Sequence, residues 1–261
     1  MWYLLPRLIC SSILLVMKVM QLNIWGGRFG KGIIDLVNRE KPDIICFQEA
    51  MEFQGGRSFL FDDIDSIIKS TGYKHHHFVP HLGYSLMRRT ANMGLAILSK
   101  LPIIKTDSVF IRLEYTDNFD LLDSDYNVQS LQRATVQCDS GPLHVLNYHR
   151  YHDHNNKNGN EETIRQCNFI ADYVRNLSGS VILCGDFNLA PISDSIAIIE
   201  TVLHNHITNS GYQTTRTNLT KKDEVCDYIF STPDLIANSF EVLNDVVSDH
   251  RALTLELFHN Y

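Results

Sequence analysis

Several strand-length apolar runs of this chain share one property: each carries or ends in an acid, an amide or a histidine. The runs are MQLNIW with Asn23, DIICFQEA with Glu49, LHVLNYH with His149, VILCGDFN with Asp186 and Asn188, and VCDYIF with Asp227, followed later by SDH at 248–250. A single Asn or Asp after a strand is usually a turn former. Here the same pattern occurs in several runs that we expect to be buried. A buried polar group without a partner destabilises the fold, so turn formation alone does not explain these residues. We therefore expect these side chains to pair with one another, or to hold an ion, at one rim of a sheet.

The remaining apolar patterns predict many strands and few helices. Helical spacing of apolar residues occurs over 32–39, 59–70, 161–176 and 193–203. The third pattern is the clearest, with Asn160 as a predicted N-cap and two glutamates in the first turn. Strands are predicted over 19–25, 43–50, 73–79, 93–98, 103–112, 129–138, 143–149, 181–188, 225–231, 238–246 and 251–258. This order indicates an α+β chain in which sheets pack together and helices cover them.

Length and charge narrow the class of protein. The chain has 261 residues, enough for one large domain that buries roughly three quarters of its unfolded surface. Its net charge of −7 argues against a general attraction to nucleic acid, whose binding rests on contacts between cations and phosphates. A nuclease stays open as an alternative, because a local basic groove or a metal can offset an acidic average.

The first 18 residues read as an apolar extension that precedes a domain over 19–261. The apolar stretch in them is too short to span a bilayer. A signal sequence, a short membrane anchor and an extended start upstream of Met17 stay open as interpretations. Six cysteines are scattered without a CxxC pair, which favours reduced thiols over a disulfide framework. We therefore predict a cytoplasmic protein, with membrane association or export through the apolar stretch as the alternative.

Taken together, the motifs resemble those of the endonuclease/exonuclease/phosphatase family, the fold of DNase I-like nucleases, neutral sphingomyelinases and inositol-polyphosphate 5-phosphatases. The matching segments are LNIWGG, PDIICFQEA, NYH, CGDFNLAP, CDYIF and SDHRALTLEL, in the family's order and across residues 19–258. GDFN followed later by SDH is the most specific part of the pattern. The resemblance implies a DNase I-like, four-layered α/β sandwich, in which two mixed or antiparallel sheets are flanked by helices.

The resemblance also implies a divalent metal site. Glu49 would be the main ligand, since a carboxylate suits Mg²⁺, which keeps several waters and often takes only one or two protein carboxylates. Asn23 would add an amide oxygen or position a water, and Asp249 would complete the site from the far side. Mn²⁺ is an alternative cofactor, and one metal or two are both consistent with the motifs.

The same resemblance assigns catalytic roles to five residues. His250 would be the general base or would orient the phosphate, with Asp227 as the carboxylate that fixes its tautomer. Asp186 would orient or deprotonate the attacking water. Asn188 and His149 would donate hydrogen bonds to the phosphoryl oxygens.

The implied activity is hydrolysis of a phosphate ester, with a phosphodiester favoured, by attack of an activated water in line with the leaving group. A nuclease acting on DNA or RNA is the alternative within enzymes, and a non-catalytic binding module on the same scaffold is the alternative outside them. Arg133 in QRATVQ either reaches phosphate or is simply solvated. The expected partner is the phosphate-ester substrate, whether lipid, small molecule or nucleic acid, and no obligate protein partner is evident. We expect a monomer.

Overall fold

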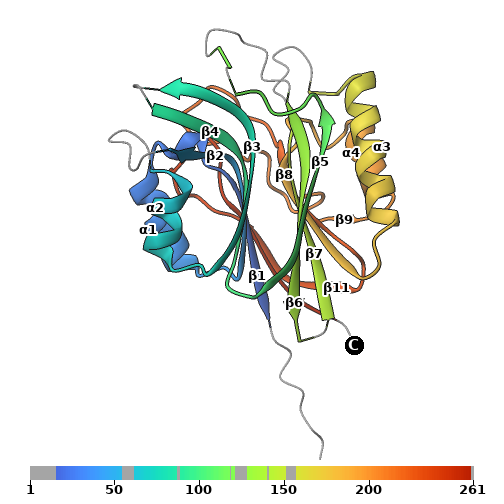
Figure 1. Ribbon diagram of the computed structural model, residues 1–261. Coiled ribbons are helices and arrows are strands. Elements are labelled where there is room, and N and C mark those ends of the chain that lie inside the picture. Colours follow the sequence, from blue (N-terminus) through green and yellow to red (C-terminus); the bar gives the residue numbers. More distant parts are fainter. Residues whose placement is uncertain are drawn as a thin grey trace, which may run out of the picture.

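The computed structural model describes residues 16–54, 62–86, 89–117, 119–120, 128–139, 141–150 and 157–259. Within them, two six-stranded sheets pack face to face, and helices cover both outer faces (Figure 1). The layers are therefore helices, sheet, sheet and helices. This arrangement confirms the four-layered α/β sandwich that the resemblance implies.

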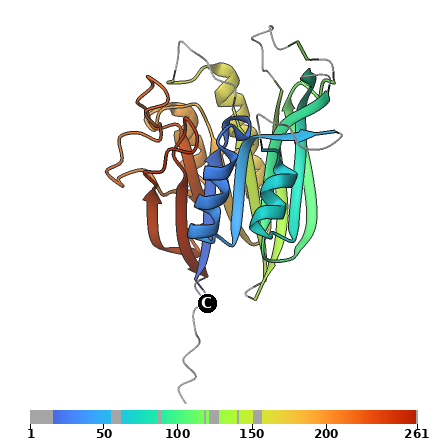
Figure 2. The ribbon, with the colours of Figure 1, turned by 90° about the vertical axis from the view of Figure 1, so that its left-hand side faces the viewer.

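The first sheet has the strand order β11-β12-β1-β2-β4-β3. Its strands are β1 (Met17–Asn23), β2 (Ile44–Phe53), β3 (His75–Leu86), β4 (Arg89–Ser99), β11 (Leu235–Val242) and β12 (Leu253–His259). Strands β1 and β2 are parallel, and the other neighbours are antiparallel. Helices α1 (Gly30–Glu40) and α2 (Ile64–Thr71) lie on the outer face of this sheet, which Figure 2 shows from their side.

The second sheet has the order β5-β6-β7-β8-β10-β9. Its strands are β5 (Ile103–Arg112), β6 (Gln129–Cys138), β7 (Gly141–His149), β8 (Ser180–Asp186), β9 (His204–Asn205) and β10 (Asp227–Ser231). Strands β7 and β8 are parallel, and the other neighbours are antiparallel. Helices α3 (Glu161–Arg175) and α4 (Asp194–Glu200) cover its outer face (Figure 1).

Each sheet therefore contains one parallel pair joined by a helix, β1-α1-β2 in the first and β7-α3-β8 in the second. The carboxyl ends of parallel neighbours lie at the same edge of a sheet. Strands β1 and β2 also contact β8 across the interface between the sheets. Asn23, His149 and Asp186 at the ends of β1, β7 and β8, and Glu49 within β2, are thereby brought to one rim of the sandwich.

Alternation along β1 shows how the sequence builds the two packed layers. Val19 joins the core between the sheets, whereas Met20 and Leu22 join the core beneath α1 and α2. Successive side chains of a strand point to opposite faces. Gln21 and Asn23 are therefore on the face that meets the second sheet, and both are buried. Two polar side chains of one apolar strand thus face the interior of the molecule.

Most predicted elements are present, with shifted ends. Asn160 caps α3, and its side chain accepts a hydrogen bond from the amide of Thr163, as the sequence predicts. The predicted strand over 19–25 ends at Asn23, because Trp25 and the two glycines after it adopt positive φ and form a short turn, η1 (Trp25–Gly27). The predicted strand over 238–246 is wrong in its bounds, since β11 covers Leu235–Val242. Residues 59–61 of the predicted second helix lie outside the described residues.

The predicted apolar extension also lies mostly outside the described residues. Strand β1 begins at Met17, two positions inside that extension, and pairs with β12 from its first residue. No helix of the described part is long and apolar enough to cross a membrane. The described cysteines, at 46, 138, 167, 184 and 226, are all unpaired. The domain bounds and the cytoplasmic location stay predictions.

Candidate active site

The ends of four central strands bring polar side chains from both sheets together. Asn23 ends β1, and its amide Nδ2 donates to Glu49 Oε1 of β2 at 2.9 Å and to Asp186 Oδ2 of β8 at 3.2 Å. His149 ends β7, and its Nε2 lies 3.8 Å from Glu49 Oε1 and 3.6 Å from Asp186 Oδ2. Four residues predicted from separate motifs thus form one cluster across the two sheets.

A bulge in β2 aims Glu49 at this cluster. The pairing of β2 with β4 shifts register between Phe47 and Ala50, and Glu49 has a φ of 52°. Bulges re-aim side chains, and positive φ in residues other than glycine concentrates at functional sites. Asn188, directly beyond β8, has a φ of 50° as well. The backbone is therefore in an uncommon conformation at two of the predicted site residues.

Asn147 of β7 holds this bulge from the opposite sheet. Its Nδ2 donates to the carbonyl oxygens of Phe47 at 2.9 Å and of Ala96 at 3.3 Å, and its Oδ1 accepts from Gln48 Nε2 at 2.7 Å. All of these groups are buried. A buried carbonyl must find a donor, and the bulge obtains one from the side chain of the facing sheet.

The amide chain continues from the bulge to a buried carboxylate. Gln21 Nε2 donates to Gln48 Oε1 at 2.7 Å and to Asp227 Oδ1 at 3.0 Å. Asp227 is fully buried and also accepts from the hydroxyl of Thr215 at 2.6 Å. The orientation of Asp227 is therefore set by contacts from two other segments of the chain.

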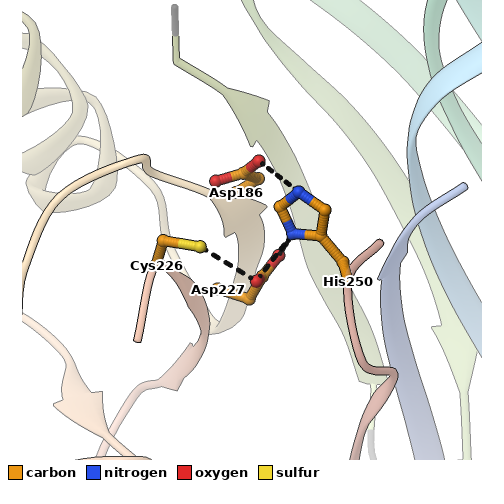
Figure 3. Close-up of side chains that lie close together, drawn as sticks. All are labelled: Asp186, Cys226, Asp227 and His250. Atoms are coloured by element: carbon orange, nitrogen blue, oxygen red, sulfur yellow. Dashed lines mark hydrogen bonds and ion pairs between the residues drawn. The ribbon is translucent and has the colours of Figure 1, made fainter. Parts of the chain in front are cut away.

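Asp227 in turn holds His250. The imidazole Nδ1 lies 3.0 and 2.9 Å from the two carboxylate oxygens of Asp227. On the other side of the ring, Nε2 lies 3.4 Å from Asp186 Oδ2. Figure 3 shows the ring between the two acids, with the Cys226 thiol donating to Asp227. This is the geometry of a carboxylate–imidazole pair that moves or holds a proton.

Ligand atoms of Asp186, Cys226, Asp227 and His250 lie within 4.8 Å of one another, a spacing at which a metal ion could be held. The donor set argues against Mg²⁺ at this position. Thiols and imidazoles suit softer metals, whereas Mg²⁺ takes oxygen ligands and keeps several waters. The Asp227 oxygens are also occupied by the hydrogen bonds just described. We therefore interpret this cluster as the proton-handling part of the site.

Glu49 fits a hard cation better. Its side chain is 27% exposed, which leaves room for water around the carboxylate. The Nδ2 of Asn23 bridges it to Asp186, so carboxylate oxygens from both sheets lie close together. The Asn23 Oδ1 accepts from the amide of Trp25 at 3.0 Å. In this arrangement Asn23 orients the two carboxylates, and Glu49 has the chemistry to bind the ion.

The charges of the buried site oppose the effect of burial. Burial alone would lower the pKa of His250, but the carboxylates of Asp227 and Asp186 outweigh it and raise this pKa well above its ordinary value. Burial alone would raise the pKa of Asp186, but the positive charges of His250 and His149 outweigh it and hold that pKa below its usual range. The two groups thus stabilise each other as an ion pair.

The remaining two predicted residues contact cations. Asp249 Oδ2 lies 3.3 Å from an Arg216 nitrogen and 3.9 Å from His250 Nε2. Asn188 Oδ1 accepts from Lys157 Nζ at 3.0 Å and from Arg216 at 3.4 Å. The Asn188 Nδ2 donates to the carbonyl of residue 150 at 2.9 Å. Both residues border the site, each beside Arg216, and their roles stay predictions.

Sequence reasoning missed several residues of the site, above all Arg216, Lys157, Thr215 and Gln21. Arg216 and Thr215 lie in a polar segment without periodicity, and only the folded chain brings them to the strand ends. Gln21 was detectable, because it is a polar residue inside the apolar run of β1. Arg133, by contrast, pairs with Asp107 at 3.1 Å and lies over the ring of Tyr173, so it contributes to packing beside α3.

A comparison with known protein families identifies the family of this chain. The model of the Endonuclease/Exonuclease/phosphatase family matches residues 20–250. The chain therefore belongs to the endonuclease/exonuclease/phosphatase family. A search of curated proteins found no similar sequence.

Solved structures share the fold at low identity. The chain is similar to an endonuclease/exonuclease/phosphatase from Bacteroides vulgatus, with 16% identity, a TM-score of 0.71, and coverage of 94% of this chain and 100% of that one. A family protein from Leptotrichia buccalis is 17% identical with a TM-score of 0.70, and the match covers 92% of this chain and 99% of that one. The mannosyl-6-phosphatase of Bacteroides thetaiotaomicron is 16% identical with a TM-score of 0.66, and the match covers 92% of this chain and 99% of that one. These likenesses show the fold alone.

Proposed function

We propose that this protein is a divalent-metal-dependent phosphoesterase that hydrolyses a phosphate ester by attack of water in line with the leaving group. The observation that carries the proposal is the His250–Asp227 pair, which faces Asp186 directly beside the Asn23–Glu49 contact. Hydrolysis of a phosphate needs a proton acceptor, donors for the phosphoryl oxygens and neutralisation of charge. The described residues supply the first two, and a cation at Glu49 would supply the third.

The metal would be Mg²⁺ or Mn²⁺, held by Glu49, with Asn23 orienting the carboxylate and Asp249 as a further candidate ligand. When bound, it would neutralise negative charge on the phosphoryl group. Asn23 would orient Glu49 and Asp186 relative to each other, because its amide donates to both. The metal site and the proton-accepting site are thus joined by one side chain.

The protein's own groups divide the remaining work. Asp186 is ionised and buried, so it would orient the attacking water and accept its proton. His250, held through Nδ1 by Asp227, would direct Nε2 at a phosphoryl oxygen. His149 lies beside both carboxylates and would donate to a second phosphoryl oxygen. Asn188 would orient the side chains of Lys157 and Arg216, both of which donate to its Oδ1, beside the phosphate.

The name of one structural neighbour, a mannosyl-6-phosphatase, describes an enzyme that acts on a phosphate ester. Such an enzyme has the activity class proposed for this chain, although the identity of 16% carries only the fold. The preference for a phosphodiester over a monoester stays a prediction. A non-catalytic role is disfavoured because Glu49, Asp186 and His250 are all retained and lie in one cluster.

The proposal is tested with purified protein and a chromogenic bis-ester, alongside a monoester, sphingomyelin, duplex DNA and RNA. We expect Mg²⁺ or Mn²⁺ to support hydrolysis of at least one substrate and excess chelator to abolish it. His250→Ala should lower the rate by at least about 10²-fold, whereas His76→Ala, an exposed histidine on β3, serves as the matched control. Hydrolysis that continues in chelator, or at the wild-type rate in His250→Ala, would refute the mechanism.

A further inference from the structure

Arg216 is fixed opposite His250 by backbone pairing. Residues 206–226 form the connection from β9 to β10, and its middle part returns to the segment that precedes β12. The amide of Thr217 donates to the carbonyl of Asp249 at 3.0 Å, and the amide of Arg251 donates to the carbonyl of Thr215 at 2.7 Å. These bonds form an isolated antiparallel bridge between Arg216 and His250. The position of Arg216 is therefore set by the main chain.

The side chain of Arg216 lies inside the site. It is 4% exposed, contacts His250 Nε2, and lies 3.3 Å from Asp249 Oδ2. Its guanidinium also donates to Asn188 Oδ1 at 3.4 Å. The Nε of Arg216 makes no hydrogen bond among the described residues. A buried guanidinium with a donor still to be satisfied, beside the imidazole proposed to face the phosphate, favours an anionic ligand.

A second cation lies on the same amide oxygen. Lys157 Nζ donates to Asn188 Oδ1 at 3.0 Å, so the neutral side chain of Asn188 holds Lys157 and Arg216 side by side. Two positive charges that contact the same oxygen atom repel each other unless an anion lies between or beside them. Asn188 supplies a dipole, which orients the two cations without neutralising either.

Two carboxylates lie beside these cations. Glu224 Oε1 lies 3.5 Å from Lys157 Nζ and 3.9 Å from Arg216 Nε, without a hydrogen bond to any described residue, and Asp249 Oδ2 lies 3.3 Å from Arg216. Lys222 belongs to the same connection as Arg216. Burial lowers the pKa of Lys222, and the positive charges of Arg216 and Lys157 lower it further, whereas Glu224 and Asp249 raise it. The cations therefore share their acids, and an anionic group of a ligand would add charge-assisted hydrogen bonds.

We propose that Lys157 and Arg216, with Lys222 of the same connection as Arg216, form a subsite that binds a second anionic group of the substrate, of the phosphate class, next to the phosphate that is hydrolysed. The proposal deepens the proposed function and rests on it. In a chain of net charge −7 a local group of three cations is a specific feature. Substrates with two neighbouring phosphates would fill both positions, whereas a simple monophosphate or an uncharged ester would leave the subsite empty.

The test measures binding by isothermal titration calorimetry with inorganic pyrophosphate and inorganic phosphate, in chelator, so that it needs neither metal nor turnover. We expect the wild-type protein to bind pyrophosphate at least about tenfold more tightly than phosphate, because the second group gains charge-assisted hydrogen bonds. Lys157→Gln and Lys222→Gln should each reduce that preference. Lys221→Gln, an exposed neighbour of Lys222, is the matched control and should keep it.

Three results would overturn the subsite: a wild-type preference below about twofold, an unchanged preference in Lys157→Gln, or an equal loss in Lys221→Gln. Parallel hydrolysis assays separate this proposal from the one above. A protein that hydrolyses esters in Mg²⁺ but shows no preference for pyrophosphate loses the subsite and keeps the proposed function. A protein that prefers pyrophosphate through Lys157 but hydrolyses no ester keeps the subsite and loses the proposed function.

Discussion

Asp227 is the residue at which three chain segments meet. It accepts from Gln21 of β1 and from Thr215 of the connection between β9 and β10, and it holds His250 beyond β11. A carboxylate in this position fixes the tautomer and direction of an imidazole and compensates for its positive charge. The local geometry of the proposed reaction therefore depends on one buried acid.

Asp227→Asn tests this dependence. The amide keeps the size of the side chain but offers one acceptor oxygen and no charge, so His250 would lose the carboxylate that orients its ring and compensates for its positive charge. We expect kcat to fall by about 10²–10⁴-fold with a smaller change in KM. Asp223→Asn, an exposed acid on the same connection, is the control. Wild-type kcat in a folded Asp227→Asn variant would contradict the assigned role.

His206 gives the fold a dependence on pH that is separate from the site. It is buried, and its Nε2 lies 2.8 Å from Ser231 Oγ. Burial, with a smaller contribution from His204, lowers its pKa to about 4. In the unfolded chain its pKa returns to about 6.5. Between these pH values the unfolded state binds more protons than the folded state. The contribution of His206 to the free energy of unfolding is therefore fully present above about pH 6.5 and is lost as the pH falls toward about 4.

His206→Gln should flatten this part of the stability profile. The shift corresponds to about 3 kcal/mol of free energy of unfolding lost between pH 7 and pH 4 in the wild type. Urea unfolding at several pH values measures the loss, and the difference between wild type and variant isolates His206 from other titrating groups. His76→Gln, an exposed histidine, controls for the removal of an imidazole. Parallel profiles for wild type and His206→Gln would contradict the assignment.

At the scale of elements, strand β2 shows what sequence can and cannot predict. The apolar run DIICFQEA predicts a strand that ends on Glu49, and the strand is present, although it continues to Phe53. The bulge at Gln48 and Glu49 was not predicted, because the run is continuously apolar up to Gln48 and carries no glycine or proline that would indicate an irregularity. The bulge depends on Asn147, which reaches its carbonyl from the other sheet. A contact between residues 100 positions apart leaves no local pattern.

Asn147→Leu tests whether this cross-sheet contact positions Glu49. Leucine has a similar volume but no donor, so the carbonyls of Phe47 and Ala96 would be buried without their present partner. We expect a loss of about 2–4 kcal/mol in the free energy of unfolding and a lower kcat, because the bulge can relax. Asn168→Leu on the exposed face of α3 is the control. An Asn147→Leu variant with wild-type stability would rule out the proposed role of the contact.

At the scale of the whole molecule, the order of the strands in the two packed sheets determines where the site residues lie. Two parallel pairs, β1 with β2 and β7 with β8, place Asn23, Glu49, His149 and Asp186 at one rim. Sequence could predict these residues because each ends an apolar run, and the family resemblance supplied the two-sheet arrangement. The sequence could not predict the role of Arg216, since the pairing of 215–217 with 249–251 joins segments that are distant along the chain and forms only in the folded molecule. The residues of the proposed hydrolytic centre were therefore visible in the motifs, and the groups proposed to select a substrate were not.

The central claim is that strand ends from two sheets form one metal-dependent hydrolytic centre, with Glu49 as its ligand. The most direct measurement is kcat/KM for a phosphate ester as a function of Mg²⁺ concentration, in wild type, in Glu49→Gln and in Glu52→Gln, its neighbour on β2. We expect Glu49→Gln to lose at least about 10²-fold at saturating Mg²⁺ and to require more Mg²⁺, while Glu52→Gln stays near wild type. An unchanged Mg²⁺ dependence and rate in Glu49→Gln would contradict the role of Glu49 as the metal ligand.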